Sequence, residues 1–301
     1  MTVYPQQYPF GAPTVSGNNI TADLMLKEPT RITQYLSDLV LKKFFADRIF
    51  NNGGGVSGGA LVYTQLTKND LFATTGVQKV APGAEFPTVS FDRPEPKVAV
   101  VEKWGGKFDV TDEARDRNDL SLIQSEGVKL SNTILKQLHT EAIGQLDASI
   151  TATGADVQIT GTSWAAAAAL TLTTTSNALL PAADFAEVSK TGEEFELGTE
   201  YNLWIVNPQE LANFQVIYGD RWKAVLQSWG VDMFASNLVT AGSAYVVAER
   251  QVGEMRFEKP LSTATWREEE RETTWVQASV RPVFAVTQPY SVLKVTGLAA
   301  T

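Results

Sequence analysis

Residues 111–148 read TDEARDRNDLSLIQSEGVKLSNTILKQLHTEAIGQLDA, and this stretch carries the strongest fold signal in a chain of 301 residues. Thr111 can cap a first helical turn, and the carboxylates of Asp112 and Glu113 suit its positive end. The pattern predicts one helix from Asp112 to Ala148, about 55 Å long, which exceeds a typical globular helix. Its apolar stripe recurs at helical spacing and comprises Leu120, Ile123, Gly127, Leu130, Ile134 and Leu138.

Two β-rich runs before this helix predict a long antiparallel hairpin. The outgoing strand is Ala60–Leu66 and the returning strand is Lys97–Trp104. Several prolines and a glycine between them are typical of an irregular tip. An isolated two-stranded ribbon is marginally stable in water, so we expect the hairpin to rest on a neighbouring molecule.

The N-terminal region begins with a proline-rich stretch over residues 1–20, which predicts an extended arm. A short helix is expected within Thr30–Phe50. The next segment formally matches the GxGxxG phosphate-binding pattern, but a strand should precede that motif and a helix should follow it. Because a β-rich run follows instead, we interpret the segment as a flexible hinge, formed by Gly53, Gly54, Gly55, Gly58 and Gly59.

After the long helix, strands and helices are mixed without βαβ regularity, which favours an α+β fold. A strand is expected at Tyr201–Val206, with Asn207 and Pro208 starting the helix that follows. Two β-rich runs, Trp275–Val286 and Ser291–Val295, end the sequence.

Composition excludes several classes of function. The chain has no cysteine and one histidine, so cysteine nucleophiles, disulfides and multi-histidine metal sites are excluded. The net charge of −9 argues against a protein that binds nucleic acid tightly. The longest uncharged run, Val157–Ala183, is interrupted by Gly161 and Pro181, and the chain start lacks a signal-peptide pattern. We therefore expect neither a membrane span nor a targeting signal.

No catalytic constellation emerges from the titratable residues. His139 has no partner at catalytic spacing, and we interpret it as a solvated or interface histidine. Glu268–Glu270 could form a paired-carboxylate site, but Trp266 and Trp275 flank it almost symmetrically, which favours a hairpin tip. We therefore predict that the protein is not an enzyme and that it has no cofactor and no metal.

Five segments of the chain carry a family resemblance, and they are Ile20–Ile32, Phe44–Ile49, Val80–Pro87, Trp104–Arg117 and Arg281–Lys294. Together with the order of arm, hairpin and long helix, they resemble the major capsid proteins of tailed double-stranded-DNA bacteriophages, which have the Hong Kong 97 fold. The similarity is greatest to the capsid proteins of phages infecting actinobacteria. Encapsulins, which form protein nanocompartments, share the fold and remain the alternative.

The resemblance implies four regions. These are an N-arm over 1–50, an E-loop over 51–106, a peripheral domain formed by 107–150 with 251–301, and an axial domain over 151–250. It also implies pentamers and hexamers of an icosahedral shell enclosing double-stranded DNA without sequence-specific binding.

The implied partners are copies of the chain, with scaffolding, portal and decoration proteins as further candidates and no membrane. The implied location is the virion, after assembly in the host cytoplasm. Some family members crosslink an E-loop lysine to an asparagine in the peripheral domain. No asparagine follows Asn237, so the segment 251–301 of that domain has none, and we expect no such crosslink there. The candidate assembly contacts are Leu61, Tyr63, Phe72, Phe86, Phe91, Trp104, Lys107, Arg115 and Arg117.

Overall fold

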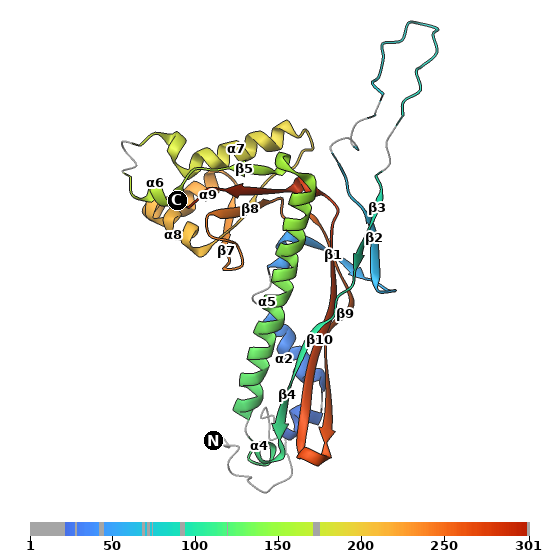
Figure 1. Cartoon of the computed structure of the whole chain (residues 1–301), viewed down its shortest axis with the longest axis vertical. Coiled ribbons are helices and arrows are strands. Elements are labelled where there is room, and N and C mark those ends of the chain that lie inside the picture. The colour runs from blue at the N-terminus through green and yellow to red at the C-terminus, as the bar shows by residue number, and fades with distance from the viewer. Residues whose placement is uncertain are drawn as a thin grey trace.

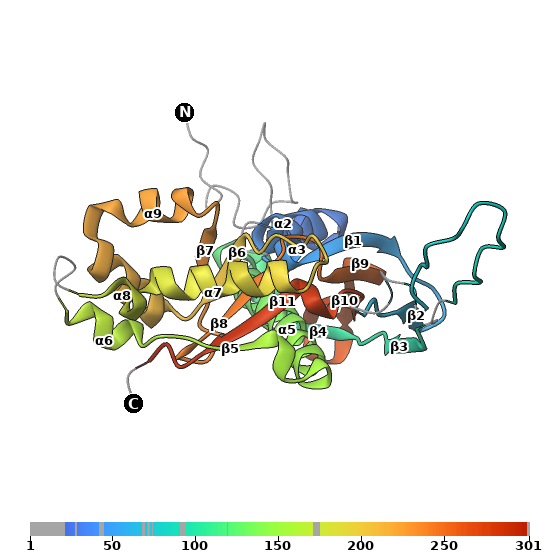
Figure 2. The same cartoon turned by 90° about the horizontal axis from the view of Figure 1, so that it is seen from above.

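The computed structural model describes residues 22–27, 29–41, 45–67, 70, 73, 75–90, 94–118, 120–170 and 175–299. One long helix, α5, runs along the molecule, with a sheet on one side of its lower part (Figure 1). A second sheet with its helices and a long hairpin project to opposite sides of its upper end (Figures 1 and 2). The predicted α+β class is confirmed. The expected extended arm over residues 1–20 lies outside the described residues.

The long helix exists, but it does not begin at Asp112. Thr111 caps a short helix, α4 (Asp112–Asp116), by accepting a hydrogen bond from the Ala114 backbone N–H. The spine helix α5 then spans Leu120–Thr153. The chain breaks between them at Asn118, whose φ is +56° and whose side-chain oxygen accepts a hydrogen bond from the Ala22 N–H at 2.8 Å. Local backbone geometry and a distant contact therefore override the helical pattern at this point.

The predicted apolar stripe of α5 faces the first sheet. Ile123, Ile134 and Leu138 are buried in one core with Val276 and Val280 of that sheet. The sheet has the order β1-β9-β10-β4, formed by Phe50–Gly55, Gly253–Glu268, Thr273–Val286 and Trp104–Thr111.

Two N-terminal helices cover the same core. They are α1 (Ala22–Lys27) and α2 (Pro29–Leu41), and the latter contributes the buried Ile32 and Leu36. Thr263 of β9 donates its hydroxyl to the Pro29 carbonyl at 2.6 Å. The N-terminal region is therefore fixed across β9 by side-chain packing and by hydrogen bonding.

The predicted hairpin tip at the acidic cluster is confirmed. β9 and β10 pair in antiparallel fashion with Trp266 opposite Trp275, and a 3₁₀ turn (Glu269–Arg271) joins them. The Glu268 carboxylate accepts a hydrogen bond from the Trp275 indole N–H at 2.6 Å. The carboxylates thus belong to a turn and do not form a paired-carboxylate site.

The glycine-rich segment predicted as a flexible hinge is partly a strand. Gly53–Gly55 belong to β1, which pairs in parallel with β9. Gly58 and Gly59 follow with φ of +90° and +75°, the left-handed region that favours glycine. A candidate hinge is therefore limited to residues 56–59, between β1 and the hairpin.

The second sheet has the order β5-β11-β8-β6-β7. Its strands are Gln158–Thr160, Val292–Thr296, Ser243–Val247, Leu203–Val206 and Asp232–Ala235. Around it lie the helices α6 (Trp164–Ala168), α7 (Pro181–Glu194), α8 (Pro208–Tyr218) and α9 (Trp222–Ser228). Short 3₁₀ turns occur at Ala155–Val157, Asn177–Leu179, Gly219–Arg221 and Pro289–Ser291.

Two expectations for this region have opposite outcomes. Asn207 caps α8 by accepting a hydrogen bond from the Gln209 N–H at 3.0 Å, as the Asn-Pro pair predicts. However, β11 pairs with β5 and β8 of the second sheet, although it belongs to residues 251–301, which the resemblance implies are part of the peripheral domain. Val292, Leu293 and Val295 are fully buried in the second core, which explains the placement of this strand.

Asp184 of α7 is a charged group inside this second core and is only 3% exposed. Its carboxylate accepts three hydrogen bonds, from the Thr162 N–H (2.8 Å), the Thr162 hydroxyl (2.9 Å) and the Trp164 indole N–H (2.6 Å). Burial raises the pKa of Asp184, although these hydrogen bonds act to lower it. The carboxylate therefore fixes the loop that leads into α6.

His139 is buried, which corrects the prediction of a solvated or interface histidine. It is 5% exposed and lies in α5, opposite α3 (Ala46–Ile49). Its Nε2 accepts a hydrogen bond from the Phe45 N–H at 3.2 Å, and the two rings lie 3.8 Å apart. Desolvation lowers the pKa of His139 to about 4, so the ring is neutral at pH 7 and joins the N-terminal segment to the spine helix.

We expect His139 to make folding stability depend on pH below 6.5. The unfolded chain binds the imidazole proton below its usual pKa of 6.5, whereas the folded chain binds it only below about 4. Lowering the pH from 7 to 4.5 should therefore remove about 2.5 kcal/mol through this group. Urea unfolding of wild type and His139→Gln at both pH values measures this contribution, because Gln does not titrate. An equal loss of stability in both proteins would contradict the assignment.

Candidate assembly surfaces

The hairpin arm, residues 60–100, is the most exposed apolar element of the described structure. Its strands β2 (Ala60–Thr64) and β3 (Pro96–Val100) pair in antiparallel fashion with Val62 opposite Val98, which confirms the predicted hairpin. Six large hydrophobic side chains of the arm are exposed, and they are Val62, Leu66, Val77, Phe86, Val98 and Val100. Such a concentration of exposed apolar groups is typical of a surface that another molecule covers.

The two faces of the arm differ. Leu61 and Tyr63 are half-buried on the face opposite to Val62, and burial raises the pKa of the Tyr63 hydroxyl. The Leu66 N–H donates to the Thr287 carbonyl at 2.8 Å and fixes the base of the arm to the body. Of the predicted contacts, Leu61 and Tyr63 thus lie half-buried within the subunit, whereas Val62 and Val98 on the other face are exposed.

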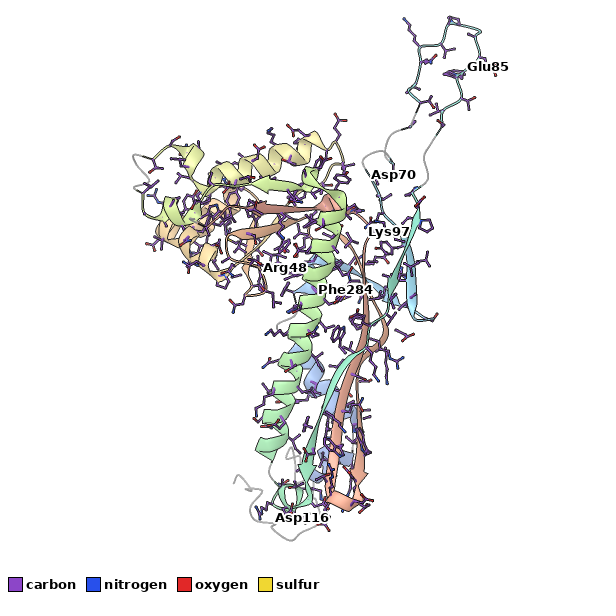
Figure 3. All side chains as sticks on the ribbon, in the orientation of Figure 1. Arg48, Asp70, Glu85, Lys97, Asp116 and Phe284 are labelled. Carbon is purple, nitrogen blue, oxygen red and sulfur yellow. The ribbon has the colours of Figure 1, made fainter. Side chains whose placement is uncertain are left out.

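The far end of the arm, residues 75–90, is here called the finger. Ser90 donates its backbone N–H to the Thr75 hydroxyl oxygen at 2.9 Å and closes the finger at its base. Val77 is 91% exposed and the predicted contact Phe86 is 82% exposed. The finger points away from the body, with Glu85 at its end (Figure 3). Phe72 and Phe91, also predicted as contacts, lie outside the described residues.

The remaining predicted contacts lie along β4 (Trp104 and Lys107), in α4 (Arg115) and directly after α4 (Arg117). Lys107 Nζ lies 4.0 Å from the ring centre of Trp275 in a cation–π contact. Arg115 forms an ion pair with Asp112 at 3.1 Å. Trp104 packs half-buried against the first core, and Arg117 is exposed. The structure therefore separates these residues from the arm, and it engages Lys107, Arg115 and Trp104 within the subunit.

Four further large hydrophobic side chains are exposed in the region of the second sheet, and the sequence did not indicate them. They are Leu170, Leu179, Val216 and Trp229. Val216 lies on the outer side of α8, whose neighbour Ile217 is buried. The period of α8 could have indicated the exposed side chain, but only the fold shows that the other three residues are exposed.

The described residues offer no metal site and no membrane span. Among them, no three His, Asp or Glu side chains are grouped to hold a metal ion. None of the described helices has the length and hydrophobicity to cross a bilayer.

Comparisons with protein-family models and with solved structures agree with this fold. The family model described as "phage capsid protein" matches residues 94–295. A solved structure of a virus-like particle from Pyrococcus furiosus has 12% identity and a TM-score of 0.59, covering 88% of this chain and 98% of that chain. A structure from Microbacterium phage Oxtober96 has 12% identity and a TM-score of 0.60, covering 84% and 90%.

A third solved structure, from Mycobacterium phage Bobi, has 15% identity and a TM-score of 0.55, covering 86% of this chain and 89% of that chain. No curated protein matches the sequence. At these identities the similar solved structures establish the fold. The assignment to a family rests on the family model.

Proposed function

The chain belongs to the phage capsid protein family and has the Hong Kong 97 fold, and we propose that its copies form the pentamers and hexamers of an icosahedral shell around double-stranded DNA. It is a major capsid protein, a structural component of the virion and not an enzyme. The encapsulin alternative has less support, because the matching family model is that of phage capsid proteins.

The observation that carries this proposal is the hairpin arm. Covering a valine or phenylalanine side chain contributes ~1.5–3 kcal/mol, and the arm exposes several of them far from its own body. An arm of one copy that lies on the next makes a head-to-tail contact. Repeated by rotation, such a contact closes into a ring. Each subunit then gives one arm and receives another, and many modest contacts add to a stable shell.

Curvature differs between pentamers and hexamers, so one sequence must fit slightly different positions. Residues 56–59 join β1 to the arm and include Gly58 and Gly59 in left-handed conformation. In the proposed shell this connection sets the angle of the arm, while β1 stays in its sheet. We also propose the regions that the family resemblance implies. These are the E-loop of residues 51–106, the peripheral domain and the axial domain.

The proposed relation to DNA is confinement without sequence-specific binding. The net charge is −9, and several arginines already have carboxylate partners within the chain. Arg48 pairs with Asp232 at 2.7 Å, and Arg267 pairs with Asp112 at 2.6 Å. Paired arginines release few counterions when DNA approaches, so the DNA is held weakly. Scaffolding, portal and decoration proteins remain further proposed partners, and assembly in the host cytoplasm is proposed with them.

Expression of the chain followed by sedimentation and negative-stain microscopy tests the proposal. We expect closed particles of uniform size. The ratio of absorbance at 260 and 280 nm then distinguishes particles that enclose nucleic acid from empty shells. A chain that sediments as a monomer at every concentration would contradict self-assembly.

A further inference from the structure

A groove lies where the hairpin arm meets the body. It has a volume of about 210 Å³ and is lined by residues that include Tyr63, Ala99, Glu102, Glu141 and Phe284. These residues come from the arm, the connection to β4, the spine helix and β10. Figure 3 shows Phe284 and Lys97 close to this junction. We call this feature the arm groove.

The arm groove exists because β10 extends beyond the end of its neighbouring strand β4. β4 pairs with β10 only as far as Trp104 opposite Val280, while β10 continues along β9 to Val286. The chain leaves β4 toward the arm, and the Glu102 N–H donates to the Pro282 carbonyl at 3.3 Å. Beyond this bond, no described strand pairs with the free edge of β10. The Gln65 side chain donates to the Val286 carbonyl at 2.9 Å, and the arm groove lies between β10, the arm and α5.

The arm groove is acidic as well as partly apolar. Glu102 and Glu141 both line it, and none of the described lining residues is basic. Glu141 accepts one hydrogen bond from the Gln145 side chain at 2.8 Å. Two carboxylates beside apolar lining residues such as Val100 and Phe284 suit a partner that brings an apolar side chain together with one positive charge.

The finger has this chemistry. A turn bonded from the Ala84 N–H to the Ala81 carbonyl (3.0 Å) forms its end. Lys79 and Phe86 each lie two residues outside this turn, on its opposite arms. Lys79 is exposed, and it has no ion partner among the described residues. One basic and one aromatic side chain are thus presented together, with Glu85 directly before Phe86, at the end of a projecting element.

We propose that the finger of one copy docks in the arm groove of a second copy, with Phe86 in the groove and Lys79 beside Glu102 and Glu141. The arm groove has a volume of about 210 Å³, which is room for a phenyl ring. The inference deepens the proposed function and rests on it, because it names the surface that receives the arm.

The occupant is a second copy because the finger and its own arm groove lie at opposite ends of one arm (Figures 1 and 3). The chain therefore carries both halves of a head-to-tail contact, one pointing outward and one at the base. Every copy donates a finger and receives a finger, which is the condition for a closed ring.

A charge exchange tests the contact in the full chain. Lys79→Glu and Glu102→Lys each place like charges together, which is costly at an interface, and each should lower the fraction of chain in shells by about tenfold or more. The double variant restores the opposite charges and should return assembly to near the wild-type level. Lys103→Glu is the matched control, because Lys103 is exposed next to Glu102 but does not line the arm groove.

The outcomes separate this inference from the proposed function. The finger contact would be overturned if the single variants assemble like wild type, or if the double variant assembles no better than the single variants. Either result would leave the proposed shell formation unaffected. A wild-type chain that forms no shells would overturn both. Because the substituted side chains are exposed, the thermal midpoint of each unassembled variant should match that of wild type and so report correct folding.

Zero-length coupling of amines to carboxylates in wild-type shells gives an independent readout. Shells assembled from mixed isotope-labelled and unlabelled chains should yield an amide between Lys79 and Glu102 or Glu141 that joins one labelled and one unlabelled peptide. Linkages restricted to chains of one label, or a Lys79 coupled only to other carboxylates, would refute the contact.

Discussion

A chain in which a short Gly-Ser linker joins Leu66 to Pro96 folds normally and forms no shells. The deleted segment holds the finger, whose side chains are mostly exposed and contribute little to either core. Its removal therefore leaves the thermal midpoint nearly unchanged. Assembly fails because every head-to-tail contact loses its projecting half, and the loss is repeated at each position of the shell.

Sedimentation and negative-stain microscopy of the shortened chain measure this result. Gln78→Ala in the full-length arm is a suitable control, since it alters an exposed polar side chain of the finger and leaves the apolar and charged groups in place. Particles of normal size from the shortened chain would show that the arm is dispensable.

Asp184→Ala should destabilise the folded subunit by about 3–5 kcal/mol, because it leaves buried donors without an acceptor. The Thr162 N–H, the Thr162 hydroxyl and the Trp164 indole N–H all bond to this carboxylate. Trp164 is fully buried and stacks on Trp204 at 6.0 Å, so its indole N–H cannot turn to water. The substitution also opens a small cavity in the second core.

Asp184→Asn refines the same test. Asn keeps the shape and accepts through one oxygen, and burial already penalises the charged carboxylate, as its raised pKa shows. We therefore expect a smaller loss, about 1–2 kcal/mol. Urea unfolding followed by tryptophan fluorescence measures both variants, with the exposed Asp220→Ala as a control within about 0.5 kcal/mol of wild type. A change below 1 kcal/mol in Asp184→Ala would contradict the role of the carboxylate.

Sequence patterns predicted those elements that are stabilised by residues close together in the chain. The apolar period of α5, the Thr111 cap and the hairpin turn after Glu268 are each fixed by residues close in sequence. Long-range contacts explain the failures. Asn118 breaks the helix while its side chain bonds to Ala22, and the glycine-rich β1 becomes a strand only because β9 lies beside it.

The same distinction applies to the functional surfaces. The arm and the exposed Phe86 follow from the sequence, because a proline-rich hairpin has no partner within its own stretch. The arm groove does not, since Glu102, Glu141 and Phe284 are distant in sequence and only the fold gathers them. His139 was misjudged for the same reason, as α3 covers it from a distant segment.

The helix α5 contributes to both cores of the subunit. Ile123 and Ile134 pack in the first core, and Leu146 and Ile150 pack in the second. Because α5 is one continuous helix from Leu120 to Thr153, it links the two cores rigidly. A displacement of either sheet in an assembled particle would therefore be transmitted to the other.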